Sequence, residues 1–145
     1  MRIALRAARP DDFDFCSRLY FSGMEETIRE LKLDMAAQTA NLRDRWIVTE
    51  VKIITCDNAD LGWLQSSMRD DAIYLGQIFI DAAFQRRGIG TKIIGCLIDE
   101  ADKTGRHIRL SVAKSNPARR LYERLGFRVE EEDDRKFHMR RRTDS

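Results

Sequence analysis

The segment with the clearest chemical potential is FIDAAFQRRGIGTKII, residues 79–94. An apolar, strand-like run leads through Arg86 and Arg87 to Gly88 and Gly90, where a helical pattern of apolar residues begins. Glycines let backbone amides approach a ligand closely, and arginines bind anions. The amides of a helix's first turn, aided by the helix dipole, also attract anions. The segment therefore predicts a phosphate-binding turn, with a plain strand-to-helix turn carrying two solvated arginines as the alternative.

Two other nucleotide-binding loops are excluded by spacing. A dinucleotide fingerprint needs a third glycine where this chain has Ile93. A Walker-type loop needs Gly-Lys-Ser/Thr after four intervening residues, and GIGTK has a different order.

A second segment, NPARRLYERLGF (residues 116–127), has the pattern of a short capped helix. Asn116 suits the N-cap, Pro117 the first helical position and Gly126 the residue after the end. Tyr122 is predicted at the edge of the packed stripe, where its ring can pack while its hydroxyl points outward. The alternative for Tyr122 is an ordinary half-buried core tyrosine. The predicted stripe consists of Ala118, Leu121 and Leu125.

Taken together, these segments resemble the GNAT superfamily of N-acetyltransferases, which transfer an acyl group from acyl-coenzyme A to an amine. QRRGIG, residues 85–90, is similar to the family's Gln/Arg-x-x-Gly-x-Gly/Ala pyrophosphate turn. Residues 116–127 are similar to its Asn-x-x-Ala-x-x-x-Tyr-x-x-x-Gly-Phe segment, in which Asn contacts pantetheine and Tyr lies near the thiol. Each motif alone is weak, but both in this order are specific. The resemblance implies an acyl-coenzyme A-dependent acetyltransferase, with acetyl-coenzyme A as co-substrate.

The resemblance also assigns roles to residues. Tyr122 is the expected catalytic acid, since a phenol with a pKa near 10 can protonate a departing thiolate. A backbone amide near residues 78–80 is expected to stabilise the oxyanion, where the strand splays from the strand at residues 107–112. The exposed backbone there would pair with pantetheine as an added strand does. The expected cofactor-binding residues are Ile78, Phe79, Ile80, Gln85, Arg86, Arg87, Gly88, Ile89, Gly90, Thr91, Asn116 and Tyr122.

The chain departs from the resemblance at the position of the general base. Many relatives carry a glutamate on the central strand, whereas this chain has Gln77, which cannot accept a proton at neutral pH. The alternatives are a water held by backbone carbonyls, an acid such as Glu25 or Glu26, or an amine that needs no base. We expect Gln77, Glu25 and Glu26 on the substrate side, with a solvated helix face as the alternative for the two glutamates. His107 and His138 are isolated in the sequence and receive no catalytic role.

The elements that must position these residues follow from apolar periodicity. Strands are predicted at 2–8, 46–57, 61–71, 72–81 and 107–112, with two closing strands between 128 and 142. Helices are predicted at 9–24, 25–45 (with an interruption allowed) and 88–105, and a short helix is predicted within 116–127. This order predicts one α+β domain over residues 1–145, with a GNAT-like, mixed and mostly antiparallel sheet of about six to seven strands and about four helices.

Composition excludes several other classes. The chain has 145 residues, 43% of them hydrophobic and 34% charged, and a net charge of +2, which predicts a soluble globular protein and disfavours nucleic acid as a partner. No apolar run suits a membrane span or a secretory signal, so a cytoplasmic protein is expected. The three cysteines lack metal-ligand spacing and are expected to be buried thiols, and no metal is expected.

The predicted partner is a small-molecule or peptide amine, and a homodimer is left open. The alternative function is a non-catalytic acyl-coenzyme A sensor or assembly module.

Overall fold

The computed structural model describes residues 2–143 and confirms the predicted α+β class. Its strands form one seven-stranded sheet in the order β1-β2-β3-β4-β5-β7-β6. β4 and β5 pair in parallel, whereas the pairs β1–β2, β2–β3, β5–β7 and β6–β7 are antiparallel. The elements are β1 (Ile3–Ala7), α1 (Phe13–Leu31), α2 (Met35–Arg45), β2 (Val51–Cys56), β3 (Ala59–Arg69), β4 (Ala72–Ile80), α3 (Ile89–Thr104), β5 (His107–Ala113), α4 (Ala118–Arg124), β6 (Arg128–Glu132) and β7 (Lys136–Arg141).

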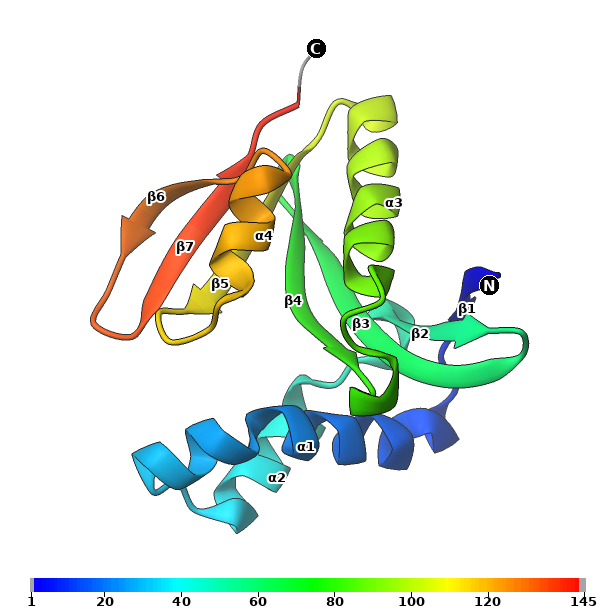
Figure 1. Cartoon of the computed structure of the whole chain (residues 1–145), viewed down its shortest axis with the longest axis vertical. Helices are drawn as coiled ribbons and strands as arrows, with labels where there is room; N and C mark the ends of the chain where they lie inside the picture. The colour runs from blue at the N-terminus through cyan, green and yellow to red at the C-terminus, as the bar shows by residue number, and fades with distance from the viewer. Residues whose placement is uncertain (1, 144–145) are drawn as a thin grey trace. The chain divides into compact units, whose positions relative to one another are not determined.

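Two compact units make up the chain. Unit 1 comprises Met1–Gln65 and Gln77–Gln85, and unit 2 comprises Ser66–Gly76 and Arg86–Ser145. Unit 1 contains α1 and α2, and unit 2 contains α3, α4 and the strands β5, β6 and β7 (Figure 1). The single domain predicted over residues 1–145 stays a prediction, and its residues 1, 144 and 145 lie outside the described residues.

Unit 1 is built around an aromatic core beneath α1. The ring of Phe79, near the end of β4, stacks on Trp63 at 5.6 Å and meets Tyr20 edge-on at 5.4 Å. Such aromatic contacts stabilise beyond the area that they bury. The buried residues of this cluster are Cys16, Tyr20, Leu42, Val51, Ile53 and Trp63.

The first helix is longer than the sequence predicted. We expected a helix at 9–24 and a second from residue 25, whereas α1 runs from Phe13 to Leu31. Gly23 lies inside α1 and serves packing, because a Cβ there would sit 2.7 Å from the ring of Phe79. The chain turns at Lys32, which has a left-handed φ of 51°, and α2 then begins with Asp34 as its N-cap.

The β2–β3 hairpin is tighter than predicted. Asp57 and Asn58, with φ values of 51° and 71°, form a two-residue turn, and β3 already begins at Ala59. Two central residues with positive φ match the right-handed twist of the strands. β2 is shorter than the strand predicted over 46–57, because residues 48–50 form a single 3₁₀ turn.

In unit 2 the sheet has one apolar and one polar face. Side chains alternate along β5, so that Ile108, Leu110 and Val112 are buried whereas Arg109 is exposed and Ser111 half-buried. α3 packs against β5, and its apolar stripe covers this buried side. The residues of that stripe are Ile89, Ile93, Ile94, Leu97 and Ala101.

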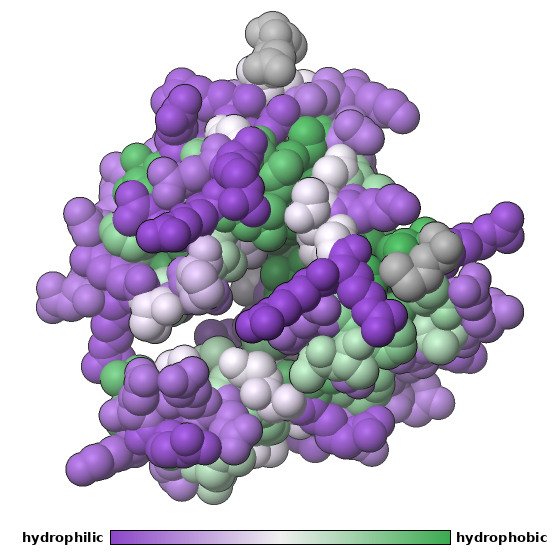
Figure 2. Space-filling model, viewed as in Figure 1, coloured by the Kyte–Doolittle hydropathy of each residue, from purple (hydrophilic) through white to green (hydrophobic). Residues whose placement is uncertain are grey.

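Hydrophilic residues predominate on the face shown in Figure 2, with smaller hydrophobic areas between them. Every helix within residues 2–143 is too short or too polar to span a bilayer. The prediction of three buried thiols is wrong for Cys96, which is exposed, whereas Cys16 and Cys56 are buried. Cys96 falls on the solvent side of α3 because it does not belong to the helix's apolar stripe.

Candidate active site

The predicted phosphate-binding turn opens α3 in unit 2. Arg86 and Gly88 have left-handed φ values of 65° and 76°, and α3 begins directly afterwards at Ile89. Left-handed residues in such a loop turn successive N–H groups inward, which creates an anion-binding concavity. Gly88 is the N-cap and offers no capping side chain, so the first-turn amides of α3 are left for another acceptor.

The turn leaves room for a ligand. A Cβ built on Gly88 would meet no heavy atom within 4 Å. Arg86, Arg87 and Thr91 are exposed, whereas Ile89 is buried and anchors the helix to the core. The residues at this turn therefore fit a diphosphate, which needs backbone amides, space and positive charge.

Asn116 lies just before α4 in the same unit. Its Oδ1 accepts a hydrogen bond from the backbone N–H of Ala118 at 2.9 Å, so it satisfies one amide of the helix's first turn. The helix itself begins at Ala118 and ends at Arg124, so it is shorter than predicted. Pro117 adopts helical angles as its N-cap.

Tyr122 is buried more deeply than the sequence suggested. We placed it at the edge of a stripe formed by Ala118, Leu121 and Leu125, but those three are only half-buried, whereas Tyr122 is 8% exposed. The ring of Tyr122 lies 5.7 Å from that of Phe127. Burial raises the pKa of the phenol, so Tyr122 is protonated throughout the neutral range. A protonated phenol is the form that a general acid requires.

The predicted residues of β4 lie in unit 1. Phe79 points into the aromatic core, and its carbonyl oxygen is so near Gly62 that a Cβ there would approach to 2.6 Å. Gln77, Ile78 and Ile80 are all half-buried. The parallel register of β4 with β5 pairs Ala72–Leu75 with residues 107–110, which places the pairing in the first half of β4.

Gln85 forms a hydrogen bond just before the predicted phosphate-binding turn. Its side-chain NH₂ donates to the carbonyl of Ile80 at 2.9 Å, which closes the 3₁₀ turn at residues 82–84. The Asp81 carboxylate caps the same turn by accepting from the N–H of Ala83 at 2.9 Å. Gln85 thus positions backbone within unit 1.

The acidic residues of α1 are solvated. Glu25 forms an i,i+4 ion pair with Arg29 at 3.1 Å, in which both side chains are more than 70% exposed. Glu26 is also exposed. This arrangement fits the solvated-face alternative, and a substrate-binding role for these residues stays a prediction.

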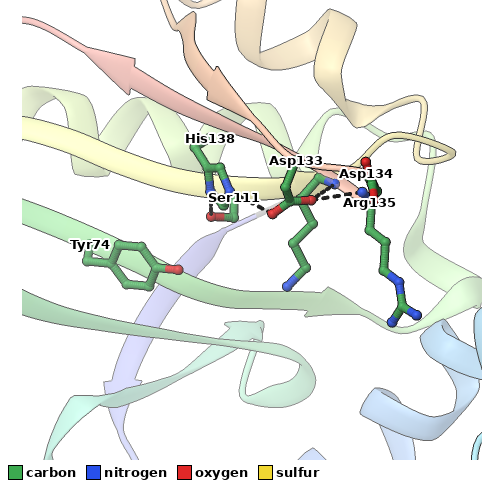
Figure 3. Close-up of a pocket in the computed structure, with 7 residues that line it drawn as sticks. Tyr74, Ser111, Asp133, Asp134, Arg135 and His138 are labelled. Atoms are coloured by element: carbon green, nitrogen blue, oxygen red, sulfur yellow. Dashed lines mark hydrogen bonds and ion pairs between the residues drawn. The ribbon is translucent and has the colours of Figure 1, made fainter.

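An open cavity of about 460 Å³ lies on the polar face of unit 2, lined by Tyr74, Ser111, His138 and residues 133–136. The Ser111 Oγ lies 2.7 Å from His138 Nδ1, and His138 Nε2 lies 3.0 Å from the Asp133 carboxylate. Figure 3 shows these side chains converging from β5, β7 and the turn between β6 and β7. We did not predict this cluster from the sequence and expected no catalytic role for His138.

The missed cluster depends on strand register. Ser111 and His138 are direct partners across the antiparallel pair β5–β7, although 27 residues separate them in sequence. The alternation of HIRLSV indicates that Ser111 lies on the face of the strand opposite Ile108 and Leu110. This alternation is the one sequence feature that pointed to a polar face at Ser111. Within residues 2–143, no group of three His, Cys, Asp or Glu side chains is arranged to hold a metal ion.

Comparisons with known proteins agree with this geometry. The family model described as "Acetyltransferase (GNAT) domain" matches residues 26–141. An uncharacterized N-acetyltransferase of Methanocaldococcus jannaschii is 36% identical over 83 residues, which are 56% of this chain and 35% of that protein. The chain thus spans about a third of the length of this relative.

Solved structures show the same fold. A Pyrococcus horikoshii protein matches with a TM-score of 0.75 at 19% identity, covering 99% of this chain and 100% of that one. The PaiA N-acetyltransferase of Thermoplasma acidophilum, solved with coenzyme A, matches with a TM-score of 0.68 at 18% identity, covering 98% and 99%. The chain belongs to the GNAT family of acetyltransferases. The bound coenzyme A of the Thermoplasma protein is consistent with acetyl-coenzyme A as the co-substrate here.

Proposed function

We propose that this protein transfers an acetyl group from acetyl-coenzyme A to the primary amine of a small molecule or peptide. The observation that carries the proposal is the turn at residues 86–91, with its two left-handed residues and the uncapped first turn of α3. Family membership makes the diphosphate of coenzyme A the expected occupant of this turn.

Asn116 and Tyr122 then have defined tasks. Because the Oδ1 of Asn116 accepts from the Ala118 N–H, its NH₂ group is the donor that would bind a pantetheine carbonyl. Tyr122 would donate its phenolic proton to the departing thiolate. A backbone amide among Ile78, Phe79 and Ile80 would stabilise the oxyanion.

The proposal is tested by measuring acetyl-coenzyme A affinity by calorimetry for wild type and Gly90→Asp. A carboxylate at Gly90 would repel the diphosphate from the first-turn amides, so we expect binding to be lost. Cys96→Asp is the matched control, because Cys96 is exposed on the same helix beyond its first turn, and it should bind like wild type. Equal affinity of wild type and Gly90→Asp would refute the assignment of this turn.

The arginines form a second arm of this experiment. If Arg86 and Arg87 hold phosphates, replacing both by alanine should weaken binding by about 1–3 kcal/mol and reduce its salt dependence. An unchanged, salt-independent affinity would mean that Arg86 and Arg87 do not bind the phosphates.

A binding module without turnover is the competing function, and the neutral side chain of Gln77 favours it. Acetyl-coenzyme A and a panel of amines and peptides separate the two functions. Amine-dependent release of free thiol supports the enzyme, whereas binding without release for every amine supports the sensor.

A further inference from the structure

The cluster of Ser111, His138 and Asp133 is held in one protonation pattern by its hydrogen bonds. Asp133 Oδ1 accepts from the backbone N–H groups of Arg135 and Lys136 at 2.8 and 2.7 Å, while Oδ2 meets His138 Nε2 at 3.0 Å. The two backbone donors, followed by His138, lower the pKa of Asp133 to about 2, so this carboxylate is ionised at any working pH.

An ionised carboxylate can only accept hydrogen bonds. In its neutral form the imidazole of His138 therefore carries its proton on Nε2, facing Asp133, and has a lone pair on Nδ1. The Ser111 hydroxyl, 2.7 Å from Nδ1, then donates a hydrogen bond to that lone pair. The remaining lone pairs of Ser111 Oγ are free to accept a proton from a third group.

The position of Ser111 relates this cluster to the proposed transfer. Ser111 follows Leu110, the residue of β5 that pairs with Leu75 in the parallel register with β4. Ser111 therefore lies where β4 and β5 are expected to separate around the acyl end of the co-substrate. Tyr74 of β4 lines the same cavity (Figure 3). The guanidinium of Arg69 lies over the Tyr74 ring, 4.0 Å from its centroid.

We infer that Ser111, His138 and Asp133 form the proton relay that deprotonates the acceptor amine, with His138 as the general base. This inference rests on the proposed function and supplies the base that Gln77 cannot provide. Ser111 Oγ takes a proton from the substrate ammonium as its own proton moves to His138 Nδ1. Asp133 is a positioning residue that orients the ring and stabilises the imidazolium.

With these groups, every proton and every electron pair of the acetyl transfer is accounted for. The ammonium and acetyl-coenzyme A yield the acetamide, free coenzyme A thiol and one proton, which the relay accepts and passes to solvent. The amine's electron pair forms the C–N bond, and the electrons of the C–S bond leave with sulfur. The second proton lost by nitrogen balances the one that Tyr122 gives to sulfur.

Steady-state kinetics of four single variants test the relay. We expect His138→Ala to lower kcat by roughly 10²–10⁴-fold, the usual contribution of a general base, with little change in the KM for acetyl-coenzyme A. Ser111→Ala should also lower kcat, because it breaks the path to Nδ1. Asp133→Asn keeps an oxygen for the backbone N–H groups of the turn but removes the charge, so it should lower kcat while the fold is kept. Asp99→Asn is the matched control, since Asp99 is exposed on α3 and does not line this cavity, and it should stay within about threefold of wild type.

Two readouts separate a relay from a structural role. Free imidazole should restore activity to His138→Ala but not to Asp133→Asn, and the double variant Ser111→Ala/His138→Ala controls for imidazole's own reaction with the thioester. Nitrogen NMR of wild type should show His138 protonated at Nε2, and Asp133→Asn should shift the proton to Nδ1. Wild-type-like kcat in His138→Ala, or protonation at Nδ1 in wild type, overturns the relay alone. Absence of amine-dependent turnover in wild type overturns both the relay and the proposed function.

Discussion

Tyr122→Phe isolates the chemical role of one hydroxyl. The side chain is 8% exposed and its ring packs near Phe127, so phenylalanine preserves nearly all of the buried apolar area. We expect the variant to unfold within about 1 kcal/mol of wild type, since volume-conserving exchanges in a core cost little. Its affinity for acetyl-coenzyme A should change equally little.

Turnover should fall much further than stability. A general acid contributes roughly 10²–10⁴-fold to the rate, which corresponds to about 3–5 kcal/mol of transition-state stabilisation. The assay follows thiol release on any amine that wild type accepts, beside the melting temperatures of both proteins. Turnover equal to wild type at equal stability would refute the assignment and leave Tyr122 as a packing residue.

The same substitution has a consequence in alkali that does not depend on catalysis. Burial raises the folded-state pKa of Tyr122 above the value near 10 of an unfolded chain. The folded protein therefore holds this proton longer, and the associated stability is complete below pH 10 and declines as the pH rises through the folded pKa. Tyr122→Phe lacks this decline, so its stability relative to wild type should rise above pH 10. Parallel alkaline unfolding curves for the two proteins would contradict the burial of the phenol.

Two further predictions concern stability. Gly62→Ala should destabilise the protein by roughly 1–3 kcal/mol in denaturant unfolding, because its Cβ would lie 2.6 Å from the carbonyl oxygen of Phe79. The control Gly95→Ala lies in α3 with open space around it and should be neutral or stabilising by up to about 1 kcal/mol, so equal effects of the two would contradict this explanation. Asp12→Asn should lose roughly 1–3 kcal/mol at pH 7, since the Asp12 carboxylate accepts two hydrogen bonds from Arg6, both at 2.9 Å. The hydrogen bonds from Arg6 lower the pKa of Asp12. The stability that they contribute is therefore present above the unfolded pKa near 3.9 and lost as the pH falls through the folded pKa. A stability difference between wild type and Asp12→Asn that does not shrink in acid would contradict this explanation.

The sequence alone determined the features that depend on local chemistry. The glycines at 88 and 105 bound α3 through left-handed caps, as their positions around the helical pattern predicted. The alternation in HIRLSV yielded β5, and the order of strands and helices yielded the α+β class. These features depend on backbone preferences and on apolar periodicity over a few residues, both of which can be read directly along the chain.

Tertiary structure decided the features that depend on distant partners. Gly23 stays inside α1 because the Phe79 ring occupies the space that a Cβ would need. Tyr122 is the most buried residue of α4. The apolar pattern of a seven-residue helix could not show that Tyr122 would be more buried than the leucines beside it. Ser111 meets His138 only through the register of β5 with β7, and a slip of one residue would send either side chain to the opposite face. Residue types can predict a phosphate-binding turn because its donors would be backbone groups of one short segment, whereas the proposed relay needs three segments placed together by the sheet.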